Sequence, residues 1–261
     1  MRQVTPKKAL GQHFLTDLQI AKDIADTLSE YQGVPVIEVG PGMGVLTQFL
    51  LEQHKDLKVV ELDRESVDYL NVNYPQLSGS IIGEDFLQLD LKTIFSGKFC
   101  IIGNYPYNIS SQIFFKVLDY KEQVVCCSGM LQKEVAERIA AGPGSKTYGI
   151  LSVLLQAWYD IEYLFTVPEH VFNPPPKVKS GVIRLVRNNV TELGCDEKLF
   201  KTVIKTSFGQ RRKTIRNSLN CFFAKDSNAL QNVLFTKRPE QLSVAQFVEL
   251  TNLVSENRII N

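Results

Sequence analysis

Short apolar and β-branched runs alternate with helix-like stretches along residues 1–187 of the 261-residue chain. The expected strands are Val34–Val39, Leu57–Leu62, Ser80–Ile82, Lys98–Ile102, Gln123–Ser128, Ile161–Thr166 and Val178–Val186. The helical patterns between the early strands are Leu46–Gln53, Arg64–Asn73, Ser111–Leu118 and Leu131–Ala141. This alternation predicts a parallel α/β sheet with crossover helices. The shorter gaps between the later strands predict an antiparallel edge.

The pattern becomes helical beyond residue 187. The expected helices there are Glu197–Thr206, Gln210–Phe223, Asn228–Val233 and Ser243–Ser255, and Ser243 is a suitable N-cap. We therefore expect an α/β domain at residues 1–187 and a small all-helical C-terminal domain at residues 188–261.

Composition places the chain among ordinary globular proteins, with 44% hydrophobic and 22% charged residues. No run approaches the ~18 apolar residues of a membrane-spanning helix, and the basic N-terminus lacks the apolar centre of a signal peptide. The five cysteines are odd in number without C-x-x-C spacing, and the three histidines are scattered. We therefore expect a cytoplasmic protein with reduced thiols and no metal site.

The net charge of +1 is unevenly distributed. Residues 1–187 carry 18 Lys and Arg against 21 Asp and Glu, whereas residues 188–261 carry 11 against 7. The basic residues of the second part cluster at Arg211, Arg212, Lys213 and Arg216. Such a cluster contacts phosphates or is simply a solvated helix face, and composition alone favours the second interpretation.

A glycine-rich turn follows the first expected strand directly. The glycines fall at Gly40, Gly42 and Gly44, and the acidic Glu38 lies two residues before them. A dinucleotide site has the spacing G-x-G-x-x-G, so the G-x-G-x-G spacing here favours an S-adenosylmethionine (SAM) dependent methyltransferase. A plain tight turn is the alternative.

The next two strand ends carry groups that suit a nucleoside. Glu61 ends the second strand, where a carboxylate accepts hydrogen bonds from ribose hydroxyls. Asp85 and Phe86 follow the third strand, and they suit the adenine amino group and the adenine ring. Because ligands of open α/β sheets bind at the carboxyl ends of strands, these residues together predict a cofactor site.

The fourth strand leads into Asn104-Tyr105-Pro106-Tyr107, which resembles the loop of enzymes that methylate exocyclic amino groups of bases. The side-chain carbonyl of Asn104 and the backbone carbonyl of Pro106 are candidate acceptors for the amine hydrogens, which localises the nitrogen lone pair. Tyr107 offers a ring face for the base, which must first leave its stack. Positioning and electrostatics then supply most of the acceleration.

Together with these motifs, the segment Lys7–Leu15 resembles the opening of the ribosomal RNA adenine dimethyltransferase family, of the type that acts on small-subunit (16S) rRNA. The resemblance covers nearly the whole chain. It implies a Rossmann-like SAM-dependent methyltransferase sheet, with cofactor contacts at His13, Leu15, Gly40, Gly42, Glu61, Asp85, Phe86 and Asn104. The chain has Tyr105 where the family usually has Leu, so a different side chain packs behind the loop.

Two later motifs extend the resemblance. In the segment His170–Ser180, it implies Phe172 as a second stacking face opposite Tyr107, and Lys177 and Lys179 as phosphate contacts. In the segment Phe208–Leu219, it implies a basic helix that binds rRNA through Arg211, Arg212, Lys213 and Arg216. Residues 144–149 resemble a mobile substrate loop.

The resemblance implies an enzyme that dimethylates two adjacent adenines of 16S rRNA in the assembling small ribosomal subunit. It implies SAM as co-substrate, no metal, no membrane and a monomer. A large-subunit (23S) rRNA dimethyltransferase of the antibiotic-resistance type is the first alternative. A non-catalytic ribosome-assembly or transcription factor on the same fold is the second, against which the intact loop at Asn104 argues. An NAD dehydrogenase is the weakest alternative.

Overall fold

The computed structural model describes residues 4–224 and 226–259. Contacts within the chain divide it into two units. The first comprises Met1–Glu137 and Asp160–Arg187, and the second comprises Arg138–Tyr159 and Asn188–Asn261.

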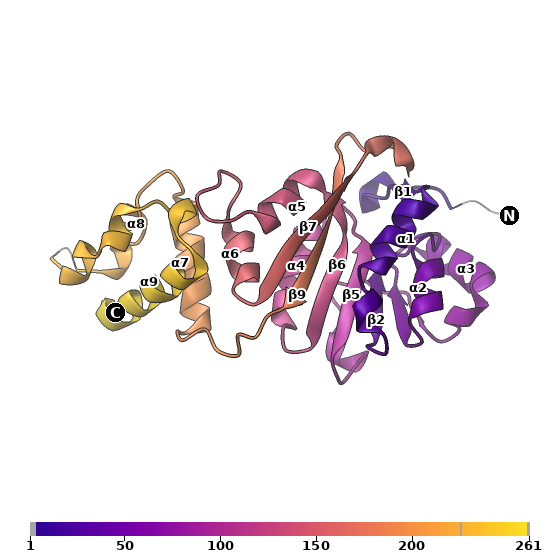
Figure 1. Ribbon diagram of the computed structural model, residues 1–261, viewed down its shortest axis with the longest axis horizontal. Coiled ribbons are helices and arrows are strands. Elements are labelled where there is room, and N and C mark those ends of the chain that lie inside the picture. Colours follow the sequence, from indigo (N-terminus) through magenta and orange to yellow (C-terminus); the bar gives the residue numbers. More distant parts are fainter. Residues whose placement is uncertain (1–3, 225, 260–261) are drawn as a thin grey trace. The chain divides into compact units, whose positions relative to one another are not determined.

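A seven-stranded sheet forms the centre of the first unit (Figure 1). Its strands, in spatial order, are β4 (Ile81–Ile82), β3 (Leu57–Val60), β2 (Val36–Val39), β5 (Phe99–Asn104), β6 (Val124–Gln132), β9 (Ser180–Arg187) and β7 (Tyr159–Val167). The five strands from β4 to β6 are parallel, and β9 pairs antiparallel with β6. The parallel strands are apolar because helices cover them, and their carboxyl ends all open on one edge of the sheet.

Two short strands form a separate antiparallel pair. β1 (Phe14–Leu15) pairs with β8 (Phe172–Asn173), with Leu15 opposite Phe172. Leu15 and Phe172 are both buried in the main hydrophobic core. This pair therefore ties the N-terminal segment to a part of the chain more than 150 residues away.

The helices of the first unit follow the strands in sequence: α1 (Leu18–Asp26), α2 (Thr47–Gln53), α3 (Arg64–Asn73) and α4 (Ser110–Asp119). α5 (Lys133–Ala140) runs across the boundary between the units. Carboxylate N-caps fix two helix starts, since Asp17 accepts from the N–H of Ile20 and Asp63 from the N–H of Glu65.

The second unit is helical: α6 (Ile150–Gln156), α7 (Glu197–Gly209), α8 (Ile215–Ser218) and α9 (Val244–Asn257). Its core is aromatic at the centre, where the rings of Phe208 and Phe247 stack at 5.9 Å and Tyr148 meets Phe208 edge-on at 6.3 Å. Asp196 caps α7, and Ser243 and Gln246 form a capping box at the start of α9. The Ser243 N-cap lies where the sequence predicts it.

The α/β fold class is confirmed, and so are the expected strand positions in the parallel part of the sheet. The expected helix over Gln210–Phe223 is wrong, because α7 ends at Gly209 and only α8 (Ile215–Ser218) is α-helical within that range. Glycine at 209 and the like charges of Arg212 and Arg216, which are four residues apart, disfavour a continuous helix there. Lys213 instead closes a turn by donating its N–H to the carbonyl of Gln210.

The observed division into two units also differs from the expected single boundary after residue 187. Residues 138–159 belong with the C-terminal helices, although they precede two strands of the sheet. The cause is α6, whose apolar side chains Leu151, Leu154 and Leu155 are buried and which packs against α7 and α9. Sequence order alone does not reveal such an excursion, and the sequence analysis identified no helix there.

No helix within residues 4–224 and 226–259 is long and apolar enough to cross a membrane. In the same residues, His, Cys, Asp and Glu side chains form no group of three or more that suits a metal ion. Cys100, Cys126 and Cys127 are free thiols buried in β5 and β6. Burial raises the pKa of Cys126 and Cys127 to about 12, so these side chains pack as neutral thiols.

Candidate active site

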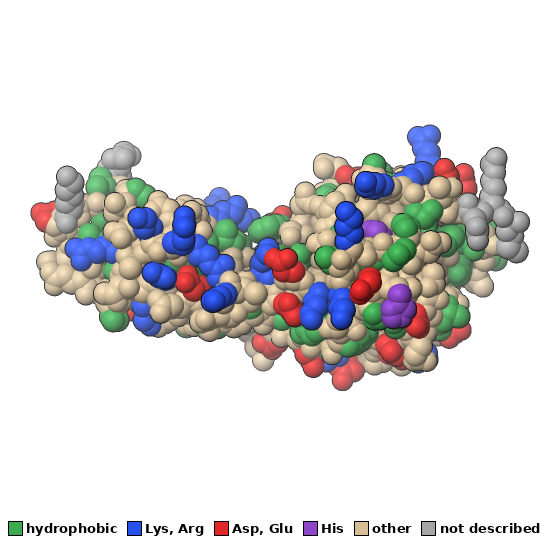
Figure 2. All heavy atoms as spheres, turned by 90° about the horizontal axis from the view of Figure 1, so that it is seen from above, with side chains coloured by type: hydrophobic (Ala, Val, Ile, Leu, Met, Phe, Trp, Pro, Cys, Tyr) green, Lys and Arg blue, Asp and Glu red, His purple; other side chains and the backbone are tan. Residues whose placement is uncertain are grey.

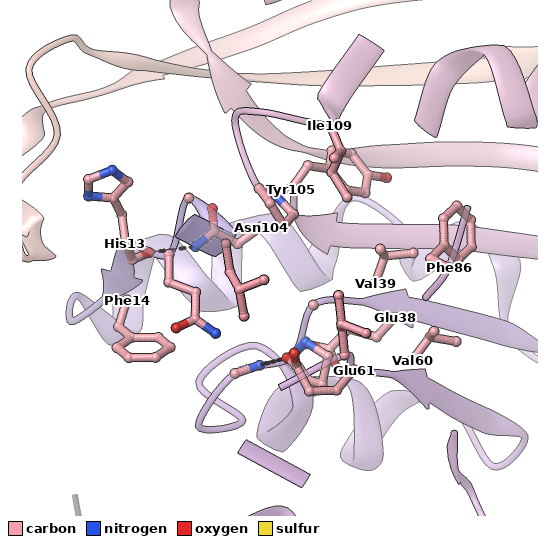
Figure 3. A pocket seen from close by; sticks show the side chains of 18 of the residues that line it. His13, Phe14, Glu38, Val39, Val60, Glu61, Phe86, Asn104, Tyr105 and Ile109 are labelled. Carbon is pink, nitrogen blue, oxygen red and sulfur yellow. Dashed lines mark hydrogen bonds between the residues drawn. The ribbon is translucent and has the colours of Figure 1, made fainter. Parts of the chain in front are cut away.

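A cavity opens at the carboxyl ends of β2, β3 and β5 in the first unit (Figure 3). Five segments line it: 10–15, 38–46 without Gly44, 60–62, 84–87 and 104–109. Every residue that the sequence analysis assigned to the cofactor lies in one of them, namely His13, Leu15, Gly40, Gly42, Glu61, Asp85, Phe86 and Asn104. The parallel register brings these strand ends together.

The glycine turn forms one wall of the cavity. Gly42 has a φ of 56°, and a Cβ at this position would lie 2.9 Å from the ring of Phe14. Only glycine allows both this backbone conformation and the close approach of the N-terminal segment. The backbone N–H of Gly42 donates to Glu61 Oε2 at 3.0 Å, which joins the turn to the end of β3 (Figure 3).

Glu61 is 6% exposed, and both of its carboxylate oxygens are anchored. Oε2 accepts from Gly42 and Oε1 accepts from the N–H of Asp63 at 2.8 Å. Burial raises the pKa of Glu61, and the two backbone N–H donors oppose that rise. Each oxygen keeps a lone pair, so the side chain can still accept two hydroxyl hydrogens from a ribose.

Glu38 also lines the cavity, from the end of β2. It is 1% exposed, and the hydroxyl of Thr47 donates to its Oε2 at 2.7 Å. Burial raises the pKa of Glu38 to about 8, so at neutral pH the carboxyl is mainly protonated. The sequence analysis noted Glu38 as part of the glycine pattern without giving it a role.

The loop that begins with Asn104, for which the sequence predicts the catalytic role, starts at the last residue of β5. Asn104 donates its Nδ2–H to the backbone carbonyl of His13 at 3.1 Å (Figure 3). This bond uses the amide nitrogen of Asn104 and leaves its Oδ1 as an acceptor at the cavity. The carbonyl of Pro106 accepts from the N–H of Ile109 at 3.2 Å and has a second lone pair for another donor.

Tyr107 and His13 form an aromatic pair beside this loop, with ring centroids 5.4 Å apart. The phenol of Tyr107 shares a 2.5 Å hydrogen bond with the hydroxyl of Ser180, and burial raises its pKa. His13 donates its Nδ1–H to the carbonyl of Pro174 at 2.7 Å. Both rings are therefore fixed from behind by partners on the 174–180 segment.

Phe172 does not line the cavity. It is 4% exposed, belongs to the main hydrophobic core, and sits opposite Leu15 in the β1–β8 pair. Leu15, its partner in this pair, is equally buried and lines the cavity, so the role of Phe172 as a second stacking face opposite Tyr107 stays a prediction.

Tyr105 lies behind the loop and is 1% exposed. Its phenol donates to the carbonyl of Ser128 at 2.6 Å, and its ring meets Phe114 edge-on at 5.7 Å. The space for the ring comes from two glycines, since a Cβ at Gly103 or Gly129 would lie 3.1 Å or 2.7 Å from it. The larger side chain at this position thus fills a buried slot between β5 and β6.

The N-terminal segment is tied to the region just after Glu61. Lys7 forms an ion pair with Asp63, and Gln12 donates its Nε2–H to the same carboxylate at 3.3 Å. The side-chain carbonyl of Gln12 in turn accepts from the backbone N–H of Lys7 at 2.8 Å. These contacts hold residues 10–13 as part of the cavity wall. Gln12 lies within the segment Lys7–Leu15 but has no predicted role, and the positions of Gln12 and Asp63 in the sequence give no signal of this pairing.

The candidate RNA-binding residues are mostly exposed. Lys177 and Lys179 are exposed in the first unit, and Arg212, Lys213 and Arg216 are exposed in the second. Figure 2 shows Lys and Arg side chains gathered on one face of the C-terminal helices. Arg211, also in the second unit, differs, because it donates to the carbonyl of Lys146 and pairs with Glu240 at 4.0 Å.

Arg211 therefore holds the loop before α6 in place. The same loop contains Gly144, whose N–H donates to the carbonyl of Glu240 at 2.6 Å, and Tyr148, which is fully buried. The role of residues 144–149 as a mobile substrate loop stays a prediction.

Comparison with known proteins identifies relatives over the whole chain. The sequence profile of the ribosomal RNA adenine dimethylase family matches residues 4–256. The ribosomal RNA small subunit methyltransferase A of Parabacteroides distasonis is 72% identical over 259 residues, which cover 99% of this chain and 97% of the relative. The protein of the same name from Phocaeicola vulgatus is 66% identical, with 97% and 91% covered.

Two solved structures share the fold. A dimethyladenosine transferase from Plasmodium falciparum aligns with a TM-score of 0.77 at 21% identity, covering 95% of this chain and all of that one. The 23S rRNA methyltransferase ErmE aligns with a TM-score of 0.69 at 24% identity, covering 92% and 99%. At these identities the likeness concerns the fold alone. The profile match and the 72% identical relative show that the chain belongs to the ribosomal RNA adenine dimethylase family.

Proposed function

We propose that this protein transfers methyl groups from SAM to the exocyclic amino groups of two adjacent adenines in small-subunit (16S) rRNA, two methyls to each. The observation that carries the proposal is that the acceptor oxygen of Asn104 and the cofactor groups Gly42 and Glu61 line one cavity. The names of the relatives support the small subunit as substrate.

The residues of the cavity fit SAM. The backbone at Gly42 has no side chain that would fill the space, Glu61 offers acceptors for ribose hydroxyls, and Asp85 offers one for an adenine amino group. Phe86 is buried beside Asp85 and provides an apolar surface for the ring. SAM supplies a methyl group on a positively charged sulfur.

The chain's own residues then prepare the nucleophile. The amino nitrogen of adenine is a weak nucleophile because its lone pair is delocalised into the ring. The oxygens of Asn104 and Pro106 accept its hydrogens and favour a pyramidal nitrogen, which localises that lone pair. Because Asn104 is fixed by His13 and Pro106 by Ile109, these oxygens need little reorganisation during the reaction.

The second methylation uses the same groups. A mono-methylated amine keeps one N–H, so one of the two acceptors remains engaged.

Tyr107 and His13 border the loop with ring faces on which an extruded base can stack. No strong base is needed in the site, since the amine loses its proton after the transfer.

The exposed cations are proposed to position the RNA. Lys177, Lys179, Arg212, Lys213 and Arg216 are available to phosphates, and such contacts orient an RNA without reading its sequence. We propose in addition that the protein acts as a monomer in the cytoplasm, on small subunits that are still being assembled.

The test is methyl transfer with tritiated SAM to undermethylated small subunits, followed by nucleoside analysis. We expect N6,N6-dimethyladenosine, two residues per subunit, and little transfer to naked large-subunit RNA. Transfer to large-subunit RNA with none to small subunits would contradict the proposed substrate. RNA binding without transfer to either would indicate a non-catalytic assembly factor.

A further inference from the structure

The buried lysine of α4, Lys116, has no part in the chemistry proposed above. It is 9% exposed, and its ammonium group donates to the backbone carbonyls of Leu87, at 3.1 Å, and Leu89. A buried cation is costly unless several groups compensate it. The contacts of Lys116 therefore indicate a specific task for the charge.

Two aromatic rings complete the surroundings of the ammonium group. Nζ lies 5.5 Å from the ring centroid of Phe86 and 5.5 Å from that of Tyr120, within the range of a cation–π interaction. Burial lowers the pKa of Lys116, and the carboxylates of Asp119, Asp85 and Asp90 oppose that change. Two carbonyls, two ring faces and nearby carboxylates thus hold one cation.

All of these partners except Tyr120 and Asp119 lie on the segment 85–90, which follows the short strand β4. Asp85 and Phe86 line the cavity, and the carboxylate of Asp85 accepts from the N–H of Leu87 at 2.9 Å. Tyr120 supports the far end of the segment, because its hydroxyl donates to Asp90 at 2.9 Å. The second half of α4 thus fixes this segment in place.

We propose that Lys116 is a positioning residue that fixes the adenine end of the cofactor cavity by holding the backbone of residues 86–89 against α4. The proposal rests on the proposed function, which places the adenine at Asp85 and Phe86. α4 begins at Ser110, directly after the catalytic loop, so the same helix connects the methyl-acceptor end of the site to the adenine end.

The test measures binding of S-adenosylhomocysteine by calorimetry to the full-length protein and three single variants. K116M keeps the length of the side chain and removes the charge, and we expect about tenfold weaker binding, or about 1.4 kcal/mol. K92M removes an exposed lysine of the same region and should bind like the wild type. D85N should weaken binding, because the N–H of Leu87 already occupies Oδ1, so the new side-chain NH2 faces the adenine amino group as donor against donor.

Two further measurements separate positioning from general stability. In the D85N background, K116M should cost clearly less than tenfold, because both changes act through the same segment. In steady-state kinetics, K116M should raise the KM for SAM and leave both kcat and the KM for small subunits near their wild-type values. An analogue with a carbonyl in place of the adenine amino group should lose less affinity in K116M than S-adenosylhomocysteine does.

Each outcome decides between the two proposals. If D85N binds like the wild type, the placement of the adenine is wrong and the role of Lys116 is wrong with it. If D85N binds weakly while K116M matches K92M, only the role of Lys116 is wrong. A fall of kcat in K116M at saturating SAM, with an unchanged KM, would also overturn it.

The variant Y120F covers the case in which K116M does not fold. It removes one oxygen from a half-buried side chain, and with it the hydrogen bond that this oxygen donates to Asp90 and the one that it accepts from the N–H of Leu91. We expect severalfold weaker binding of S-adenosylhomocysteine, in the same direction as K116M. Wild-type affinity in Y120F would then contradict the support of this segment by α4.

Discussion

The cavity of the first unit and the basic residues 211–216 of the second unit, called here the basic turn, hold their polar side chains in opposite ways. In the cavity, the amide of Asn104 and the carboxylate of Glu61 are held by backbone partners before any ligand arrives. In the basic turn, Arg212, Lys213 and Arg216 extend into solvent. The one strongly fixed member of that cluster is Arg211, and its partners are within its own unit.

The proposed function accounts for this difference. Chemistry at one nitrogen atom requires acceptors at fixed positions, and preorganisation provides most of the rate. The phosphates of an RNA are numerous and chemically alike, so exposed Lys and Arg side chains can bind them without being held in a fixed geometry. A single substitution should therefore have a large effect in the cavity and a small, additive effect in the basic turn.

The largest effect is expected at Asn104. Asn104→Ala removes the fixed acceptor, and kcat should fall by about 10²–10³-fold, as for the loss of a preorganised transition-state contact. RNA binding should persist. Single-turnover methyl transfer and a filter-binding assay measure the two properties separately.

Asn71→Ala provides the matched control, because the same truncation is made on the exposed face of α3. It should leave both kcat and RNA affinity unchanged. An Asn104→Ala variant with the turnover of the wild type would contradict the role assigned to this side chain and make the cavity as tolerant as the basic turn.

The next effect concerns the packing behind the loop. Tyr105→Leu empties part of the slot between Gly103 and Gly129, and the free energy of unfolding should fall by about 2–4 kcal/mol. Tyr105→Phe removes the hydrogen bonds of the phenol with the carbonyl of Ser128 and with Cys127 Sγ, at a cost of about 1–3 kcal/mol. Urea denaturation of the three proteins tests this order.

Activity should follow stability only in part, because the loop at Asn104 continues directly from Tyr105. We expect kcat to fall more in Tyr105→Leu than in Tyr105→Phe, with both proteins folded at the assay temperature. Equal stability of Tyr105→Leu and the wild type would mean that this slot accepts the residue usual in the family without loss.

Local patterns made most of the cavity predictable from the sequence. Gly40, Glu61 and Asp85 each follow an apolar strand, and parallel strands bring their ends together whatever the details of packing. Asn104 is predictable for the same reason, since it ends β5. The sheet order, in contrast, follows from pairing that no single segment encodes.

The parts that the sequence did not reveal depend on contacts between distant segments. The burial of Phe172 follows from the pairing of β8 with β1, two strands too short to show a periodic pattern. In the sequence, Lys116 is an ordinary helix position. Its contacts arise only when the segment after β4 packs against α4 in the folded protein. Gln210–Phe223 has helix-forming residues, and local charge repulsion and Gly209 outweigh them.

A smaller effect is expected in the basic turn. Arg216→Ala should lower the slope of log affinity against log salt for RNA by about 0.7–0.9, the contribution of one phosphate contact. Lys213→Ala should act in the same way, and the two losses should add. An unchanged slope in both variants would place these side chains on a merely solvated surface.

Arg211→Ala offers the comparison within the same cluster. Its guanidinium is engaged with Lys146 and Glu240, so its loss should reduce the stability of the second unit by up to about 1 kcal/mol. The salt slope should change less than in Arg216→Ala. Slopes that fall equally in both variants would show that Arg211 leaves its partners to bind RNA.

The smallest effect concerns His54, a buried polar side chain of the first unit that is not among the residues lining the cavity. It is 3% exposed, and neither ring nitrogen has a hydrogen-bond partner among the described residues. Burial lowers the pKa of His54 from 6.5, so on acidification the unfolded chain takes up a proton before the folded protein does. The stability associated with the neutral ring is therefore complete above pH 6.5 and decreases as the pH falls below it, by at most about 1.4 kcal/mol per pH unit.

Urea denaturation at several pH values should show a steeper loss between pH 7 and pH 5 in the wild type than in His54→Leu, whose other titrating groups are the same. Parallel curves would mean that the ring keeps its ordinary pKa in the folded protein, and hence that His54 too has a polar partner.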